Sequence, residues 1–170
     1  GMMGTANMPI KCTIEMDIDR GFNDASTSYT TKPDFDAGII LAGNHEGAMY
    51  GDVDIIVKSG KVGRIVGGTL GNQRTVNETL NPPYNTYMGR VNILLDPTLS
   101  RFYNKIDAEE TTNGRIMVTE LYGGSCGRGF ADNVVVDNPF YGTSTVTING
   151  GTFQRLAKDY KNDGILCGIF

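Results

Sequence analysis

Tryptophan is absent from the 170-residue chain, which has one histidine and three cysteines. Cys12, Cys126 and Cys167 lack C-x-x-C spacing, and the chain has a single histidine, so a zinc site is not expected. We therefore expect no metal and no cofactor. The cysteines are expected to be small buried apolar side chains, and the alternative is one disulfide plus one free thiol.

Long apolar runs are also missing, since none reaches the roughly 20 residues of a membrane-spanning helix. Gly1-Met2-Met3-Gly4 leads directly into polar sequence without the pattern of a signal peptide. A glycine ahead of a methionine is typical of the residue left by tag removal, so the compartment stays open.

Basic clusters are absent as well. The formal net charge is −4 and no run of lysines and arginines occurs, whereas a phosphate-binding surface usually carries a basic patch. We expect no nucleic-acid partner. The charge is too modest, and the apolar content too high, for a disordered acidic chain.

Glycine, by contrast, is abundant at 23 residues, and valine, isoleucine and threonine are frequent. This composition predicts short strands joined by tight turns. Apolar residues alternate with polar ones over Ile10–Asp19, which predicts a strand with one buried face. The polar segment Gly21–Asp36 is expected to be a loop.

Further strands are predicted at short apolar segments separated by glycine-containing turns. The segments are Ile39–Leu41, Val53–Val57, Val62–Val66, Val91–Leu95, Ile116–Val118, Val134–Val136, Val146–Ile148 and Ile165–Phe170. Two interruptions, Gly71–Gly89 and Lys105–Gly114, are expected to be surface excursions.

An internal repeat is the most informative feature. Ile55–Ile65 matches Val146–Leu156 without a gap, with Gly60 on Gly151 and Arg64 on Arg155. A looser third copy, Val91–Phe102, carries Arg101; it begins with Val91 on Ile55 and needs a one-residue shift. The shared pattern is strand, two-residue turn, then apolar-x-Arg-apolar.

Repeated strand–turn–strand units predict an all-β solenoid, a short right-handed parallel β-helix with loop excursions. Residues 1–38 would form an N-terminal strand, cap and loop, and residues 39–170 the coils of one domain. The alternative is a β-sandwich, in which Asn113-Gly114 and Asn149-Gly150 would serve as hairpin turns.

Val146–Phe153 and Leu121–Gly127 resemble the coil pattern of pectin-lyase-like right-handed β-helices, in particular glycine-rich bacterial surface or secreted proteins. The resemblance covers roughly residues 39–170. It implies an exported protein with a cell-surface or glycan-related role. No segment matches the active-site aspartates and bases of the lyases and hydrolases in that superfamily.

The repeat also suggests a ligand site. If the three copies stack as successive coils, Arg64, Arg101 and Arg155 would form a row about 5 Å apart. Mutual repulsion in such a row would be relieved by interleaved carboxylates or by an anionic ligand such as an acidic glycan. The favoured alternative is that intervening coils separate the three arginines and that each pairs locally or with water. Four tyrosines in or beside loop segments could stack on a sugar face, although packing against the edge of a coil is the favoured outcome for each: Tyr84, Tyr87, Tyr103 and Tyr122. Tyr122 is the one included in the candidate ligand site.

Other polar groups are expected to have no chemical role. His45 beside Glu46 lacks a nucleophile motif. The acidic residues are expected to lie on solvated surfaces, and the segments Gly67–Gly71 and Gly123–Gly129 at corners of coils. These acidic residues are Glu15, Asp17, Asp19, Asp34, Asp36, Asp52 and Asp54.

The sequence favours a non-catalytic binding or structural module, with a polysaccharide lyase or glycoside hydrolase acting on acidic polysaccharide as the alternative. A homo-oligomer, or a longer solenoid, is expected to form through the apolar C-terminal segment Ile165–Phe170, because the ends of a β-helix present unpaired edges.

Overall fold

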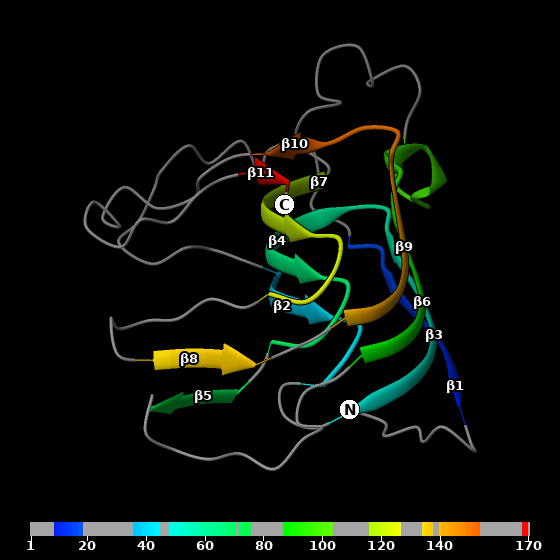
Figure 1. Ribbon diagram of the computed structural model, residues 1–170. Helices are drawn as coiled ribbons and strands as arrows, with labels where there is room; N and C mark the ends of the chain where they lie inside the picture. The colour runs from blue at the N-terminus through cyan, green and yellow to red at the C-terminus, as the bar shows by residue number, and fades with distance from the viewer. Residues whose placement is uncertain are drawn as a thin grey trace.

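The computed structural model describes residues 9–18, 36–44, 48–70, 72–75, 87–103, 116–126, 134–137, 140–153 and 168–169. Strands make up most of this part, and one three-residue helix, η1 (Pro97–Leu99), accompanies them (Figure 1). The predicted all-β class is confirmed. Within these ranges no helix has the length and apolar character needed to cross a membrane.

The strands form three sheets. The first sheet has the order β1-β3-β6-β9, and the second has the order β10-β7-β4-β2, with β11 also on β7. A third sheet pairs β5 with β8 antiparallel. The bounds are β1 (Ile10–Met16), β2 (Ala37–Leu41), β3 (Met49–Val57), β4 (Gly60–Val66), β5 (Asn72–Thr75), β6 (Tyr87–Leu95), β7 (Ile116–Tyr122), β8 (Val134–Asp137), β9 (Phe140–Ile148), β10 (Thr152–Phe153) and β11 (Gly168–Ile169).

The chain visits the first two sheets alternately. It passes from β1 to β2, from β3 to β4, from β6 to β7 and from β9 to β10, and we call each such pair of strands a level. Every pairing between levels is parallel. Among the described residues these two sheets contain no antiparallel pairing of the kind expected for a β-sandwich, and Asn149-Gly150 joins strands of different sheets.

Inward-pointing side chains of successive levels stack in rows that form the core. One row contains Ile14, Ile55, Ile93 and Val146, and the next contains Met16, Val57, Leu95 and Ile148. The second sheet contributes Ile40, Ile65 and Leu121 from the opposite side. Each fully buried aliphatic side chain stabilises the fold by roughly 1.5–3 kcal/mol.

The register confirms the ungapped repeat as far as Phe153, where the described segment ends. Ile55 and Val146 both align with Ile93, so they occupy equivalent positions two levels apart. Gly60 and Gly151, which the alignment equated, share a φ of 119°. That left-handed conformation favours glycine because it lacks a Cβ.

The third copy was aligned wrongly. The alignment equated Val91 with Ile55, whereas in the structure Val91 pairs with Val53. After Leu95 the chain enters η1 rather than a second strand, because Asp96 accepts hydrogen bonds from Thr98 and Pro97 starts a helical turn.

The eight apolar segments and the N-terminal alternating segment all contain strands, as predicted. β5 was missed, because its residues Asn72-Gln73-Arg74-Thr75 lie in the expected excursion Gly71–Gly89 and have no apolar alternation. β1 pairs with β3, so the N-terminal strand belongs to the first sheet.

A column of glycines sets the spacing of the first sheet. Gly51, Gly89 and Gly142 occupy successive levels, and Gly51 and Gly89 have φ values of 147° and 145°. A Cβ on Gly89 would overlap the carbonyl oxygen of Gly51, and one on Gly142 would overlap the carbonyl oxygen of Gly89. Only glycine therefore allows this close backbone approach.

The side chain of Tyr87 lies buried beside this column. Its hydroxyl donates to the carbonyl oxygen of Gly51 (3.0 Å), and its ring stacks on Phe140 with centroids 5.2 Å apart. Burial, followed by the nearby Asp52 carboxylate, raises the pKa of Tyr87 to about 12. Tyr87 is thus a core residue, in agreement with the packing expected from its sequence.

The two glycine segments predicted to lie at corners of coils directly follow β4 and β7 where the structure describes them. The amide of Gly67 donates to the carbonyl oxygen of Tyr122, and a Cβ on Gly67 would overlap the carbonyl oxygen of Gly123. Beyond this contact, Thr69 donates its amide to Ser125 Oγ (3.1 Å). These corners return the chain from the second sheet at equivalent places on successive levels.

Replacing Gly89 with alanine tests the column. The new Cβ would meet Gly51, and φ would remain in a region that L-residues avoid, so we expect Gly89→Ala to lower the free energy of unfolding by about 3 kcal/mol or more. Gly38→Ala in β2 is the control, because a Cβ there meets no atom within 4 Å. Urea unfolding should show stability unchanged or raised by about 0.5 kcal/mol for the control. Equal effects would contradict the column.

Candidate functional site

A shallow groove crosses the outward face of the first sheet. Outward and inward side chains alternate along each strand, which places Lys11 and Thr13 of β1, Asp52 and Asp54 of β3, and Arg90 of β6 on this face. These residues, with Cys12, line an open cavity of about 360 Å³.

The carboxylates in the groove already have donors from the protein. Asp52 accepts from the Arg90 amide (3.0 Å) and lies 3.9 Å from Arg90 Nε, while Asp54 accepts from Asn92 Nδ2 (2.6 Å). The Lys11 ammonium has no hydrogen bond or ion pair with any described residue. The charged donors left for a ligand are therefore Lys11 and the terminal nitrogens of Arg90.

An aromatic and apolar row borders the groove. Tyr50, Met88 and Tyr141 lie in register on β3, β6 and β9, two residues before the polar row on the same face. Tyr141 is 63% exposed. A tyrosine ring of this kind offers rigid apolar area with a polar tip.

Two of the sequence-predicted ligand residues meet on the second sheet. Arg64 pairs in register with Glu120, and its Nε lies 2.7 Å from Glu120 Oε2. Tyr122 donates its hydroxyl to the same oxygen (3.2 Å), and the Arg64 guanidinium lies 5.9 Å from the Tyr122 ring centre. Burial, together with Cys126 and Glu120, raises the pKa of Tyr122. Glu120 thus neutralises Arg64.

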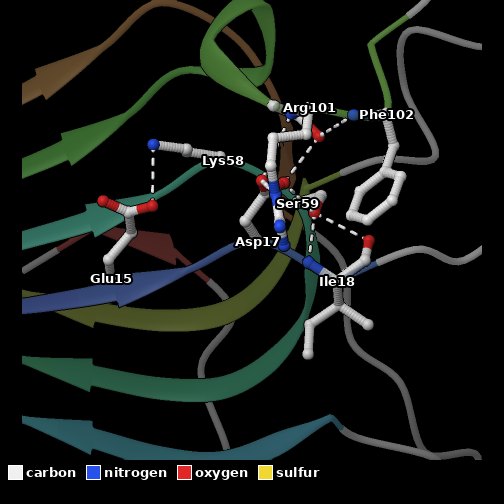
Figure 2. Close-up of polar contacts among 8 residues, drawn as sticks. Glu15, Asp17, Ile18, Lys58, Ser59, Arg101 and Phe102 are labelled. Carbon is white, nitrogen blue, oxygen red and sulfur yellow. Dashed lines mark hydrogen bonds and ion pairs between the residues drawn. The ribbon is translucent and has the colours of Figure 1, made fainter.

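Arg101 lies elsewhere, at the corner that follows η1 (Figure 2). Its Nε and its amide both donate to Asp17 Oδ2, at 2.9 and 3.2 Å. Ser100 and Ser59 donate their hydroxyls to Asp17 Oδ1, at 2.7 and 3.2 Å. The Asp17 carboxylate therefore connects three successive levels of the stack.

The electrostatics of Asp17 reflect these contacts. Its side chain is only 5% exposed. Burial alone would raise the pKa of Asp17, but the hydrogen bonds from Ser100, Arg101 and Ser59 together outweigh it and lower the pKa from 3.8 to about 2. Asp17 is therefore ionised and anchors the corner.

The expected row of arginines is not formed by Arg64 and Arg101. The residue in register with Arg64 on the next level is Glu120, and Arg101 follows η1 at a corner of the first sheet. Arg155 lies outside the described residues. Arg64 and Arg101 instead follow the favoured alternative, in which each arginine is separate and pairs locally, with Glu120 and Asp17 respectively. A ligand-binding role for Arg64, Arg101 or Tyr122 stays a prediction.

Other candidates from the sequence have ordinary partners or lie outside the described ranges. Glu15 pairs with Lys58 (2.8 Å), and Asp36 accepts from the Lys61 amide (2.7 Å). Cys12 is half-buried and Cys126 buried, and both are free thiols. The residues outside the described ranges are Asp19, Asp34, His45, Glu46, Tyr84 and Cys167.

The groove was not predicted as a site. Its aspartates were assigned to solvated surfaces, and Lys11, Arg90 and Tyr141 were not considered. The 91-residue repeat offset could have revealed part of it, because it extends backwards to equate Tyr50-Gly51 with Tyr141-Gly142. The pairing of β1 and β6 with β3 has no comparable signal.

Comparisons of the chain with protein-family models, with curated proteins and with solved structures give no match.

Replacing Asp17 with asparagine tests the corner. The folded pKa lies below the ordinary value of 3.8, so the ionised carboxylate stabilises the fold fully above about pH 5 and loses this effect as the pH falls toward 2. We expect Asp17→Asn to cost about 1–2 kcal/mol at pH 7, with the difference closing near pH 2.

Glu15→Gln is the matched control for this variant. Its ion pair with Lys58 is half exposed, so we expect a loss of about 0.5 kcal/mol or less. Chemical denaturation of both variants between pH 2 and pH 7 makes the measurement. A pH-independent deficit in Asp17→Asn would contradict the role of its charge.

Proposed function

We propose that this chain is a short right-handed parallel β-helix that acts as a non-catalytic, glycan-binding module of an exported or cell-surface protein. The ligand would bind on the outward face of the first sheet. The groove lined by Lys11, Asp52, Asp54 and Arg90 is the observation that carries this proposal.

The strand order supports the β-helix. A coil must contribute one strand to each sheet before the next coil begins, and the alternation of the chain between the two parallel sheets meets this requirement. The stacked rows of inward aliphatic side chains also fit, since no single level could bury its own apolar residues.

The groove suits a polar ligand rich in oxygen. Its aspartates are already hydrogen-bonded within the sheet, whereas Lys11 and the end of Arg90 are available as donors. A saccharide supplies hydroxyl or carboxylate oxygens to such donors, and Tyr141 beside the groove supplies a ring for stacking on a sugar face. Because Asp52 and Asp54 balance the two cations, we expect modest affinity.

Titration calorimetry with neutral and uronate-containing oligosaccharides, preceded by a glycan-array screen, tests the proposal. We expect Arg90→Ala to weaken binding about tenfold, since hydrogen bonds from charged groups contribute roughly 1.5–3 kcal/mol. Tyr141→Ala should also weaken it. Binding of a charged saccharide should fall as salt is raised.

Arg101→Ala is the matched control, because it removes an exposed arginine away from the groove. We expect its affinity for the saccharide to equal that of the wild type. If Arg101→Ala abolishes binding while Arg90→Ala does not, the ligand site is at the corner and the groove is refuted. No saccharide binding at millimolar concentrations would refute the glycan proposal itself.

Polysaccharide cleavage is the second candidate function. Asp52 and Asp54 lie two residues apart on the same face of β3, with Arg90 beside them, and paired carboxylates near a cation are a common arrangement in enzymes that cleave glycosidic bonds. Incubation with polygalacturonate and Ca²⁺, followed by detection of unsaturated or reducing ends, decides between the two. Turnover that is lost in Asp54→Asn would replace the binding module with an enzyme.

A further inference from the structure

In the part of the chain that the structure describes, β9 is the last strand of the first sheet. Among the described residues no strand pairs with the outer edge of β9 (Figure 1). Seven of the nine residues of β9 are exposed. An edge of this length presents a row of unpaired amide and carbonyl groups.

The core rows end incompletely at this strand. In the row of Met16, Val57, Leu95 and Ile148, the two middle residues are fully buried. Ile148, the last member, is 39% exposed. The inward face of β9 therefore retains apolar area that a further strand would cover.

β9 also lacks the features that normally prevent pairing at an edge. Its sequence, Phe-Tyr-Gly-Thr-Ser-Thr-Val-Thr-Ile, has no charge and no proline. The opposite edge strand, β1, carries Lys11 and Glu15 on its outward face. A neutral strand meets no buried charge when it pairs with a copy of itself.

Parallel stacking of β1 from a second copy onto β9 is disfavoured by the glycine column. Gly51, Gly89 and Gly142 each lie against the carbonyl oxygen of the residue in register on the preceding strand. A Cβ at any of these positions would overlap that oxygen. β1 carries Ile10 at this position, in register with Gly51. In the same geometry its Cβ would overlap the carbonyl oxygen of Gly142.

We infer that β9 pairs antiparallel with β9 of a second copy of this chain, about a two-fold axis at Thr145. The Asn149 amide donates to Leu95 in β6, and successive residues of a strand direct their backbone groups to opposite edges. Gly142, Ser144, Val146 and Ile148 therefore direct theirs to the outer edge. With Thr145 on the axis, Ser144 and Val146 of the two copies form hydrogen-bonded pairs.

The side chains fit this register on both faces. Outside, Thr145 faces Thr145 of the second copy, and Thr143 faces Thr147, which are favourable cross-strand pairs. Inside, Gly142 lies opposite Ile148, so the absence of a side chain leaves room for the exposed isoleucine. The interface is isologous and closes at two copies.

The pairing would form one continuous sheet of eight strands. Because the axis is perpendicular to the sheet, the two grooves would open on the same side. Two grooves on one face would favour a repeating polysaccharide over a single short oligosaccharide. This preference rests on the proposed glycan binding, whereas the dimer itself does not.

Sedimentation velocity and light scattering between 1 and 200 μM test the dimer. We expect the wild type to approach twice the chain mass of 18.4 kDa as concentration rises. Ser144→Pro should remain monomeric, because it removes an outward amide that proline can replace on an edge strand. A wild type that stays monomeric throughout overturns the inference, whatever its glycan binding.

Charge variants on the outward face test the register without disturbing the core. Thr145→Lys places two ammonium groups opposite each other, so its dimer should be roughly twofold to fivefold weaker at low salt. Thr145→Asp should behave likewise, and an equimolar mixture of the two should form heterodimers preferentially.

Thr147→Lys is the matched control for the charge variants, because its partner across the axis is Thr143. We expect its dimer to match that of the wild type. If the Thr145 variants dimerise like the wild type and their mixture shows no preference, the β9 pairing is overturned.

Discussion

The close approach of successive strands at Gly51, Gly89 and Gly142 is the constraint on which the rest of the first sheet depends. At these positions a Cβ on the residue of one level would overlap the backbone carbonyl of the preceding level. Glycine therefore fixes which residue of each strand faces which residue of its neighbour. A slip of one residue would turn every inward aliphatic side chain outward.

Once the register is fixed, it decides which polar groups meet. Lys11, Asp52 and Arg90 lie on the outward face because the next residue of each strand points inward. These next residues are Cys12, Val53 and Val91, which stack on one another in the core. In the second sheet the register likewise places Glu120 beside Arg64. The neighbour of Arg64 on the next strand is therefore a carboxylate and not a second arginine. An arginine that recurs in the sequence repeat therefore lies beside a residue of opposite charge in the folded protein.

The sequence predicted what depends on local pattern. Alternation and apolar segments located most strands, and the Gly60–Gly151 match found two equivalent turns because both need a left-handed φ. The prediction of the third repeat copy failed because it matched residues by apolar character alone. Val91 was equated with Ile55, whereas it pairs with Val53, and Pro97 starts a helical turn where the repeat has a second strand. The contact of Asp17 with Arg101 joins residues 84 positions apart and has no local signal.

The glycine constraint also bears on how the stack can grow. A level added above β9 in the same geometry needs glycine over the Gly142 carbonyl, and β1, which otherwise has the right alternation, has Ile10 there. Head-to-tail polymerisation is thereby disfavoured even though both edges carry apolar inward faces. Antiparallel pairing of β9 with β9 of a second copy avoids this clash, because Gly142 then lies opposite Ile148 and leaves room for its side chain. The residues that pack the levels so tightly thus also restrict the kind of partner that the open edge can accept.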